Sequence, residues 1–418
     1  MKKNLIIVFM VTALMLGLIS AASAVTEMEI LVDKLVEKGI LTPADGDKII
    51  RESQSEAKKQ QESVIKEAKT KILPDWVQKT KLTGDFRLRY QWDDRDCSDQ
   101  SNRFRFRARL ALETKIAETL KFTFGIASGP SDPRSTNQTM NDVFSHKQLN
   151  IDLANVAWTP YEWATLLGGK MKNPVYTVDQ LIWDNDIRPE GVAAQFNRKF
   201  NDDVSGFLNA GVFILGENSV SNNNPYMFVI QPGIDWRITE CVKLKYALGW
   251  TDIPNIEGKP QLAYSAKTNT YEKDAAGKDI YKYGYNLLTM TGELGFKNPL
   301  HNMVNYAALF GEFTHNTAVS RNNNGFMTGF YFGDEKVTDK KQWQFRYSFR
   351  RLEANADLDV LPDSDFYGGA TGAYGHKATF QFGLMKNVWY EMNYYRTELI
   401  SSPEKPENVL QTDLNFKF

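Results

Sequence analysis

From Lys81 to the C-terminus, apolar and polar residues alternate one by one, and this period of two recurs in segment after segment. The clearest case spans 102–113, where apolar side chains from Phe104 to Leu112 occupy every second position. The intervening positions carry four arginines, Arg103, Arg105, Arg107 and Arg109. Successive side chains of a strand point to opposite faces, so the pattern predicts β-strands with one apolar and one charged face. A soluble sandwich would turn the arginines to water, and a membrane barrel would turn them to its lumen.

Sixteen segments of this kind can be counted, an even number, as a closed single-chain bacterial barrel requires. The mean hydropathy of −0.43 would suggest a soluble protein, but lumen-facing residues offset lipid-facing ones in any such average. The segments lie near 81–92, 102–113, 120–129, 149–158, 164–172, 190–200, 204–216, 225–236, 240–251, 284–297, 302–315, 324–332, 341–352, 375–386, 388–399 and 408–418.

The connections between these segments alternate in length. Short ones, such as 116–119 and 159–163, alternate with longer ones, of which 130–148, 173–189, 252–283 and 353–374 are the longest. Short periplasmic turns and long external loops are typical of outer-membrane barrels, whereas a sandwich has no reason to sort its loops this way. We therefore predict an all-β transmembrane fold, a 16-stranded antiparallel outer-membrane β-barrel over 79–418, preceded by a short helical segment.

The first 24 residues have the features of a secretory signal peptide. Lys2 and Lys3 precede an apolar run over 5–19, and Ala22-Ser23-Ala24 is a small-residue cleavage site. The run is too short for a membrane-spanning helix of about 20 residues, so we predict cleavage after Ala24. The predicted location is the outer membrane of a Gram-negative bacterium.

Residues 25–74 are predicted to form a helical periplasmic segment. A first helix ends at Gly39, and a second begins with Thr42 as N-cap and Pro43 at the first helical position. Ile50, Ala57 and Val64 are seven residues apart, which fits either a weak coiled coil or a solvated amphipathic helix packed on the next domain.

Three stretches resemble bacterial porins, and especially the group called putative porins in proteobacteria. They are KLTGDFRLRYQW at 81–92, NRFRFRARLALE at 102–113, and GKMKNP followed by WDNDIRPEGVAAQF through 196. The resemblance implies a 16-stranded water-filled pore, usually a trimer, whose third external loop folds inward. The strand count makes 173–189 that loop, and Asp184, Asp186 and Glu190 resemble its acidic constriction residues. General porins lack the charged helical segment, so its role stays open.

The first two strands predict a concentration of positive charge in the lumen. If Trp92 pairs with Asn102, Arg89 faces Arg105, Arg87 faces Arg107, and Asp85 faces Arg109. Opposed like charges destabilise a sheet, so a soluble domain would rarely stack them in this way. We predict a basic pore lining, including the arginine ladder of the first two strands, composed of Arg87, Arg89, Arg103, Arg105, Arg107, Arg109, Lys170, Lys172, Arg346 and Arg350.

The predicted lining supports two interpretations. Arginines facing the acidic loop would create a transverse field that favours polar solutes, with some preference for anions. Alternatively, arginines and acidic residues pair simply to hold the loop in place. Both can hold in the same pore.

The predicted function is passive diffusion of small hydrophilic solutes and ions through the pore. Alternatives are an envelope tether acting through 26–72, or a barrel sheath for a partner electron-transfer protein. The four histidines lie in or near predicted loops, without HExxH or haem-attachment spacing, so we expect no enzyme activity, cofactor or metal. The chain ends on Phe418, which resembles the signal read by the outer-membrane assembly machinery. Other expected partners are membrane lipids, lipopolysaccharide and two further copies in a homotrimer, with no nucleic acid.

Overall fold

The computed structural model describes residues 31–32, 34–52, 55–56, 75–95, 99–217, 223–301, 303–403 and 405–418. The chain divides into two compact units, Met1–Lys79 and Thr80–Phe418. The predicted signal peptide and the positions of Ala57 and Val64 lie outside the described residues.

The N-terminal unit contains two helical stretches joined at Gly39, whose φ of +68° suits a residue without a side chain. The second stretch begins at Pro43, and the backbone amide of Asp45 donates to the Thr42 hydroxyl over 3.2 Å, which confirms Thr42 as its N-cap. A side chain at Gly46 would approach Val32 and Val36 to about 3 Å, so the two stretches pack closely there. A short helix, α3 (Asp75–Gln78), ends the unit. None of the described helices combines the length and apolar character needed to cross a membrane.

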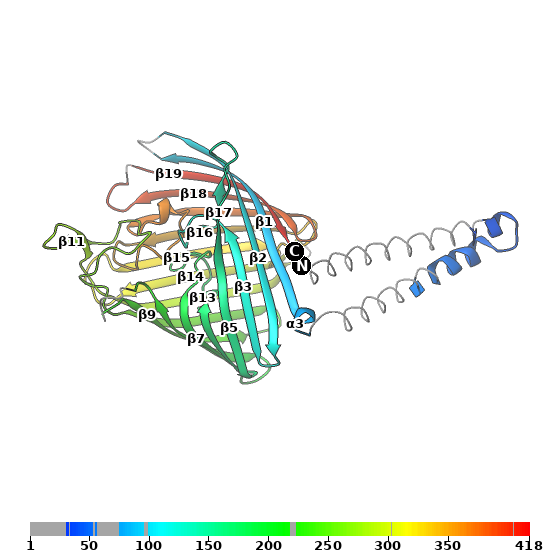
Figure 1. Ribbon diagram of the computed structural model, residues 1–418, viewed down its shortest axis with the longest axis horizontal. Coiled ribbons are helices and arrows are strands. Elements are labelled where there is room, and N and C mark those ends of the chain that lie inside the picture. The colour runs from blue at the N-terminus through cyan, green and yellow to red at the C-terminus, as the bar shows by residue number, and fades with distance from the viewer. Residues whose placement is uncertain are drawn as a thin grey trace, which may run out of the picture. The chain divides into compact units, whose positions relative to one another are not determined.

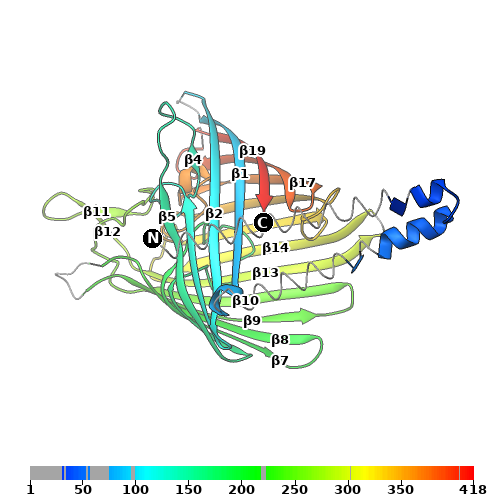
Figure 2. The ribbon, with the colours of Figure 1, turned by 45° about the vertical axis from the view of Figure 1, so that its right-hand side comes forward.

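The second unit consists of long antiparallel strands (Figures 1 and 2). In the described part of the chain there are sixteen of them: β1 (Thr80–Arg95), β2 (Ser101–Ala117), β3 (Leu120–Ser128), β5 (Leu149–Tyr161), β6 (Ala164–Lys170), β7 (Glu190–Lys199), β8 (Val204–Ile214), β9 (Tyr226–Arg237), β10 (Val242–Ile253), β13 (Tyr285–Leu300), β14 (Val304–Asn316), β15 (Asn324–Gly333), β16 (Trp343–Leu352), β17 (Ala373–Met385), β18 (Val388–Leu399) and β19 (Glu407–Lys417).

Each of these strands pairs with its neighbours in the chain, and β1 also pairs with β19, so the sheet closes on itself. The prediction of a closed 16-stranded antiparallel barrel is confirmed. At the closing seam Gly84 and Phe418 exchange backbone hydrogen bonds of 2.9 and 3.0 Å. A Cβ at Gly84 would lie only 2.6 Å from the Phe418 ring and 2.7 Å from the Arg109 carbonyl oxygen, so the seam needs glycine at this position.

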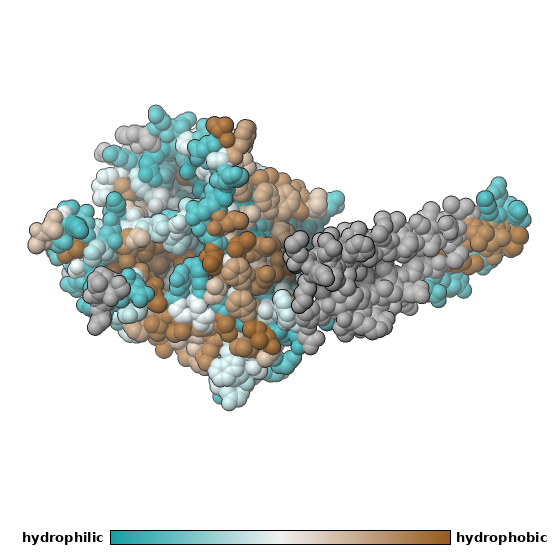
Figure 3. All heavy atoms as spheres, viewed as in Figure 1, coloured by the Kyte–Doolittle hydropathy of each residue, from teal (hydrophilic) through white to brown (hydrophobic). Residues whose placement is uncertain are grey.

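The predicted register of the first hairpin is also confirmed. Trp92 pairs with Asn102, and Arg87 with Arg107. Between the inward arginines, apolar side chains such as Leu88 and Phe104 are exposed on the outer wall. In Figure 3 hydrophobic residues form a band over the visible strands, and hydrophilic residues dominate the loop end. An apolar outer belt is what contact with lipid requires.

Three long loops contribute apolar side chains to a core on the inner wall. They lie at 171–189, at 254–284, which holds the small hairpin β11 (Tyr271–Lys273) and β12 (Asp279–Tyr281), and at 353–372, which holds the 3-10 turn η1 (Tyr367–Gly369). Loop residues including Leu181, Ile256 and Leu358 pack with inward residues of β8 to β16, such as Phe213 and Phe310. We call this cluster the inner core. A smaller apolar cluster, which includes Phe366, Tyr395 and Val409, joins the loop at 353–372 to β17, β18 and β19.

The seam yields a stability prediction. Arg89 pairs directly across it with Asp413, through two hydrogen bonds of 2.7 Å between nearly inaccessible side chains. Asp413→Asn should lower the free energy of unfolding by about 3 kcal/mol, because it leaves a buried guanidinium without its bidentate partner. Urea unfolding of the detergent-refolded barrel measures this change.

The matched control is Glu407→Gln, which removes a second seam pair. Its partner Arg95 has a side chain that is 40% exposed, so the loss should be about 1 kcal/mol or less. If the two substitutions lowered the free energy of unfolding equally, the larger contribution proposed for the buried pair of Arg89 and Asp413 would be wrong.

Candidate functional site

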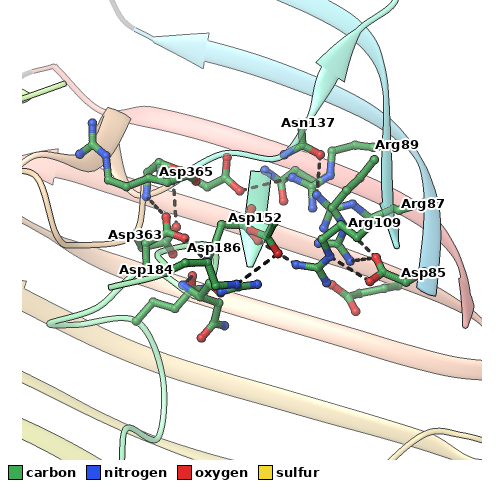
Figure 4. A pocket seen from close by; sticks show the side chains of 18 of the residues that line it. Asp85, Arg87, Arg89, Arg109, Asn137, Asp152, Asp184, Asp186, Asp363 and Asp365 are labelled. Atoms are coloured by element: carbon green, nitrogen blue, oxygen red, sulfur yellow. Dashed lines mark hydrogen bonds and ion pairs between the residues drawn. The ribbon is translucent and has the colours of Figure 1, made fainter. Parts of the chain in front are cut away.

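A cavity of about 610 Å³ lies in the polar part of the lumen, and we call it the central cavity. Its described lining includes nine basic and seven acidic side chains, contributed by β1, β2, β5, β17 to β19 and the loops at 129–148, 171–189 and 353–372. Figure 4 shows arginines of the first strands on one side and aspartates of the loops facing them. The cavity is therefore strongly charged, with both signs close together.

The arginine ladder is held mainly by carboxylates of its own wall. Arg107 and Arg109 share Asp85, with nitrogen–oxygen distances of 2.9 Å each. Arg87 donates to the Asn137 side chain over 2.5 Å and lies 3.6 Å from Asp413. Strand alternation explains this arrangement, because every second residue of β1 and β2 must point inward.

The loop at 171–189 is attached to strands on several sides of the barrel. Tyr176 exchanges backbone hydrogen bonds with the Gln231 side chain on β9, at 2.8 and 2.9 Å. The Val178 amide donates to Glu312 on β14. Arg346 on β16 donates to the Val178 carbonyl oxygen. These contacts hold the middle of the loop across the lumen.

The far end of the same loop reaches the arginine ladder. Arg109 donates to Asp186 over 3.1 Å, and Asp186 also accepts the amide and hydroxyl of Thr136. Burial disfavours the charged carboxylate, but the guanidiniums of Arg109 and Arg107 outweigh it and lower the pKa of Asp186. This carboxylate therefore remains ionised and anchors the loop.

Asp184 joins this loop to the loop at 353–372. Its amide donates to the Leu361 carbonyl oxygen over 2.7 Å, and its carboxylate accepts the amides of Ser364 and Asp186. Burial, followed by the nearby Asp363 and Asp186, raises the pKa of Asp184 well above its usual range. The two loops form one connected unit around this side chain.

A β-bulge places a further carboxylate in the cavity. Gly125 pairs with Leu153 and Ile126 with Ile151, so Asp152 is an extra residue in β5. Asp152 and Leu153 both line the central cavity, and Asp152 accepts from Arg188 over 3.3 Å. Bulges redirect side chains in this way at the rims of barrels and next to functional sites.

The predicted site residues fall into two groups. The structure places Arg87, Arg89, Arg107, Arg109, Lys172, Asp184 and Asp186 in the lining of the central cavity. The other predicted residues lie outside that lining. On β2, Arg103 pairs with Asp93 and Arg105 donates to Gln91. Arg346 and Arg350 donate to backbone carbonyl oxygens of the loop at 171–189, and Lys170 pairs with Glu190, the first residue of β7.

Several lining residues were missed by the sequence analysis. They are Arg134, Asp152, Arg188, Asp363, Asp365 and Lys377. Arg89 lies 3.3 Å from Asp365, although 276 positions separate them in the chain. Local alternation cannot reveal such a contact. The sequence did hold one signal that this loop lies inside the barrel, namely the apolar residues of 358–361. A loop that lay only in water outside the barrel would gain little from them.

The arrangement is suited to orienting polar solutes. Opposite charges fixed a few ångströms apart create a strong local field, and loop attachment keeps them in place. Among the described residues, no three His, Cys, Asp or Glu side chains are grouped so that they could hold a metal ion.

The loop at 353–372 should loosen as pH rises from mildly acidic to about 8. One carboxylate oxygen of Asp357 accepts the Leu358 amide, and the other has no hydrogen-bond partner among the described residues. Burial raises the pKa of this group to about 8. A raised acid pKa favours the protonated fold, so local stability should fall as pH rises from about 4 towards about 8. Hydrogen exchange of 353–363, corrected for its intrinsic pH dependence, should show this loss of protection.

Asp357→Asn should reduce that pH dependence, since the amide cannot ionise, and leave the part that comes from Asp184 and Asp363. Glu353→Gln serves as the control, because it removes a less buried carboxylate of the same loop and should leave the dependence intact. A wild-type loop equally protected at about pH 6 and about pH 9 would refute the assignment.

Comparisons with known proteins agree with the geometry. A family model described as "putative porin" matches residues 92–315 and 301–418. The high-pH structure of Pseudomonas putida OprB superposes with a TM-score of 0.54 at 11% identity, covering 82% of this chain and 95% of OprB. The low-pH structure of OprB gives 0.50 at 10% identity, covering 82% and 93%. No curated protein matches the chain in sequence.

Proposed function

This chain belongs to the putative porin family, and we propose that it lets small hydrophilic solutes and ions diffuse passively through a water-filled pore in the outer membrane, with a preference for anions. Family and fold support an outer-membrane porin, and they are those of a channel rather than an enzyme. The central cavity carries the proposal, because a charged lumen inside an apolar outer belt is useful only to polar solutes.

We propose that the narrow part of the pore lies between the arginine ladder and the connected loops at 171–189 and 353–372. The inner core packs against the opposite strands, and the central cavity lies beside β1, β2 and β17 to β19, so solutes would pass along these strands. Asp184 and Asp186 would contribute mainly by holding the loops, since both are fully engaged in hydrogen bonds. Glu190, paired with Lys170, would contribute less.

The proposed anion preference rests on the positive side chains of the lining that carboxylates do not neutralise. The aspartates in the lining accept hydrogen bonds from arginines, lysines or backbone amides. The described lining nevertheless holds nine basic side chains against seven acidic ones, an excess of positive charge. Lys172 and Lys417 also line the cavity and form no ion pair within the described residues. Such groups attract anions electrostatically.

The wider proposals concern assembly and targeting. We propose that the signal peptide directs export, that Phe418 serves as the assembly signal as well as completing the seam, and that three copies associate. The backbone pairing of Phe418 with Gly84 supports a role in closing the barrel.

The selectivity prediction uses Arg107→Ser. Because Arg109 keeps Asp85 and Asp186 in place, this change removes one lumenal charge and leaves the loop anchored. A unit positive charge about 7 Å away in water attracts chloride and repels potassium by about 0.6 kcal/mol each, so its removal should lower the chloride-to-potassium permeability ratio about sevenfold. The reversal potential of single channels in a planar bilayer across a KCl gradient measures this ratio.

Arg103→Ser is the matched control, since Arg103 lies on the same strand but outside the cavity lining. It should change the ratio much less. A wild-type channel that prefers potassium would overturn the proposed anion preference but not the proposed pore function. A folded barrel without conductance would overturn the pore function itself.

A further inference from the structure

A second hollow of about 260 Å³ adjoins the central cavity, and we call it the side hollow. The two share four lining residues, Lys172, Asp184, Asn185 and Arg188. The side hollow adds a different chemistry, since Val175 and Trp183 also line it. A solute crossing the central cavity therefore passes a recess with both cationic and apolar walls.

Lys172 is the available charge at this junction. It is exposed although it belongs to the loop inside the barrel, and it forms no ion pair or hydrogen bond in the described part of the chain. The neighbouring acidic group cannot neutralise it without giving up its own contacts, because both carboxylate oxygens of Asp184 already accept backbone amides. Arg188 is occupied with Asp152 and with backbone carbonyl oxygens.

The apolar wall is packed against the inner core. Trp183 is 6% exposed and packs edge-on against Phe213, with ring centroids 6.3 Å apart. It belongs to the inner core, which also anchors Val175. A preformed apolar surface with one or two polar groups is the usual composition of a small-molecule site.

We propose that the junction of the two hollows binds small organic carboxylates with an apolar body, the carboxylate at Lys172 and the body against Trp183 and Val175. This deepens the proposed function and rests on it, since such a solute would reach the site through the pore. The charge without an ion-pair partner among the described residues here is the Lys172 ammonium, a donor, so its complement is an acceptor carrying negative charge. The apolar wall selects against inorganic anions, which would gain nothing from it.

Weak binding at this point is compatible with transport. A conducting site must attract the solute enough to enter and hold it loosely enough to leave. The single exposed ammonium of Lys172 beside an apolar wall meets that requirement, because one charge holds a carboxylate less tightly than several buried guanidiniums would.

Benzoate is the probe, compared with acetate and with uncharged benzyl alcohol. Calorimetric titration of the detergent-refolded protein measures binding, and single-channel recording in KCl measures blockade. Benzoate should bind and block, acetate more weakly, and benzyl alcohol not detectably. Lys172→Gln should weaken benzoate binding about tenfold, the cost of one charge-assisted hydrogen bond.

Lys170→Gln is the control, because it removes a lysine two positions away that pairs with Glu190 and lies outside both hollows. It should leave benzoate binding unchanged. Equal binding of acetate and benzoate, or an equal effect of both substitutions, would overturn the proposal. Normal conductance without benzoate binding would overturn this inference alone, and binding without conductance would overturn the pore function alone.

Discussion

Closure of the barrel is the constraint on which the rest depends. In a hydrocarbon environment each exposed backbone group costs several kcal/mol, so an open sheet edge cannot persist there. This chain meets the requirement by pairing β1 with β19, with glycine at Gly84 where the terminal Phe418 ring crosses it. The buried pair of Arg89 and Asp413 lies in the same seam. One set of contacts therefore joins the first and last strands of the barrel and also forms part of the charged wall.

Charge in the lumen follows from strand geometry. Once the outer face must be apolar, every second residue of β1 and β2 points inward, and seven of these inward positions are arginines. Opposed arginines would repel one another if left alone. Carboxylates relieve this repulsion: Asp85 and Asp413 from the strands, and Asp186 and Asp365 from two loops. The loops are therefore part of the electrostatics of the wall.

The inner core gives the lumen two unlike sides. Apolar side chains of three loops bury one another against β8 to β16, which removes apolar surface from water and holds the loops inside the barrel. The charged cavity lies beside β1, β2 and β17 to β19, where only a smaller apolar cluster around Phe366 and Tyr395 is packed. The side hollow lies where the two environments meet, which is why it combines Lys172 with Trp183.

Alternation by itself determined the strands, the closed even-numbered barrel and the register from Trp92 to Asn102, because a one-residue slip would turn every arginine toward lipid. Individual strand ends were less well predicted: β2 extends to Ala117, beyond the arginine-rich pattern. Only the tertiary structure decided which charges meet. Asp365 reaches Arg89, Asp184 joins two loops, and the bulge at Asp152 redirects that side chain. These contacts link positions far apart in the chain through loops without periodicity, so no local pattern encodes them.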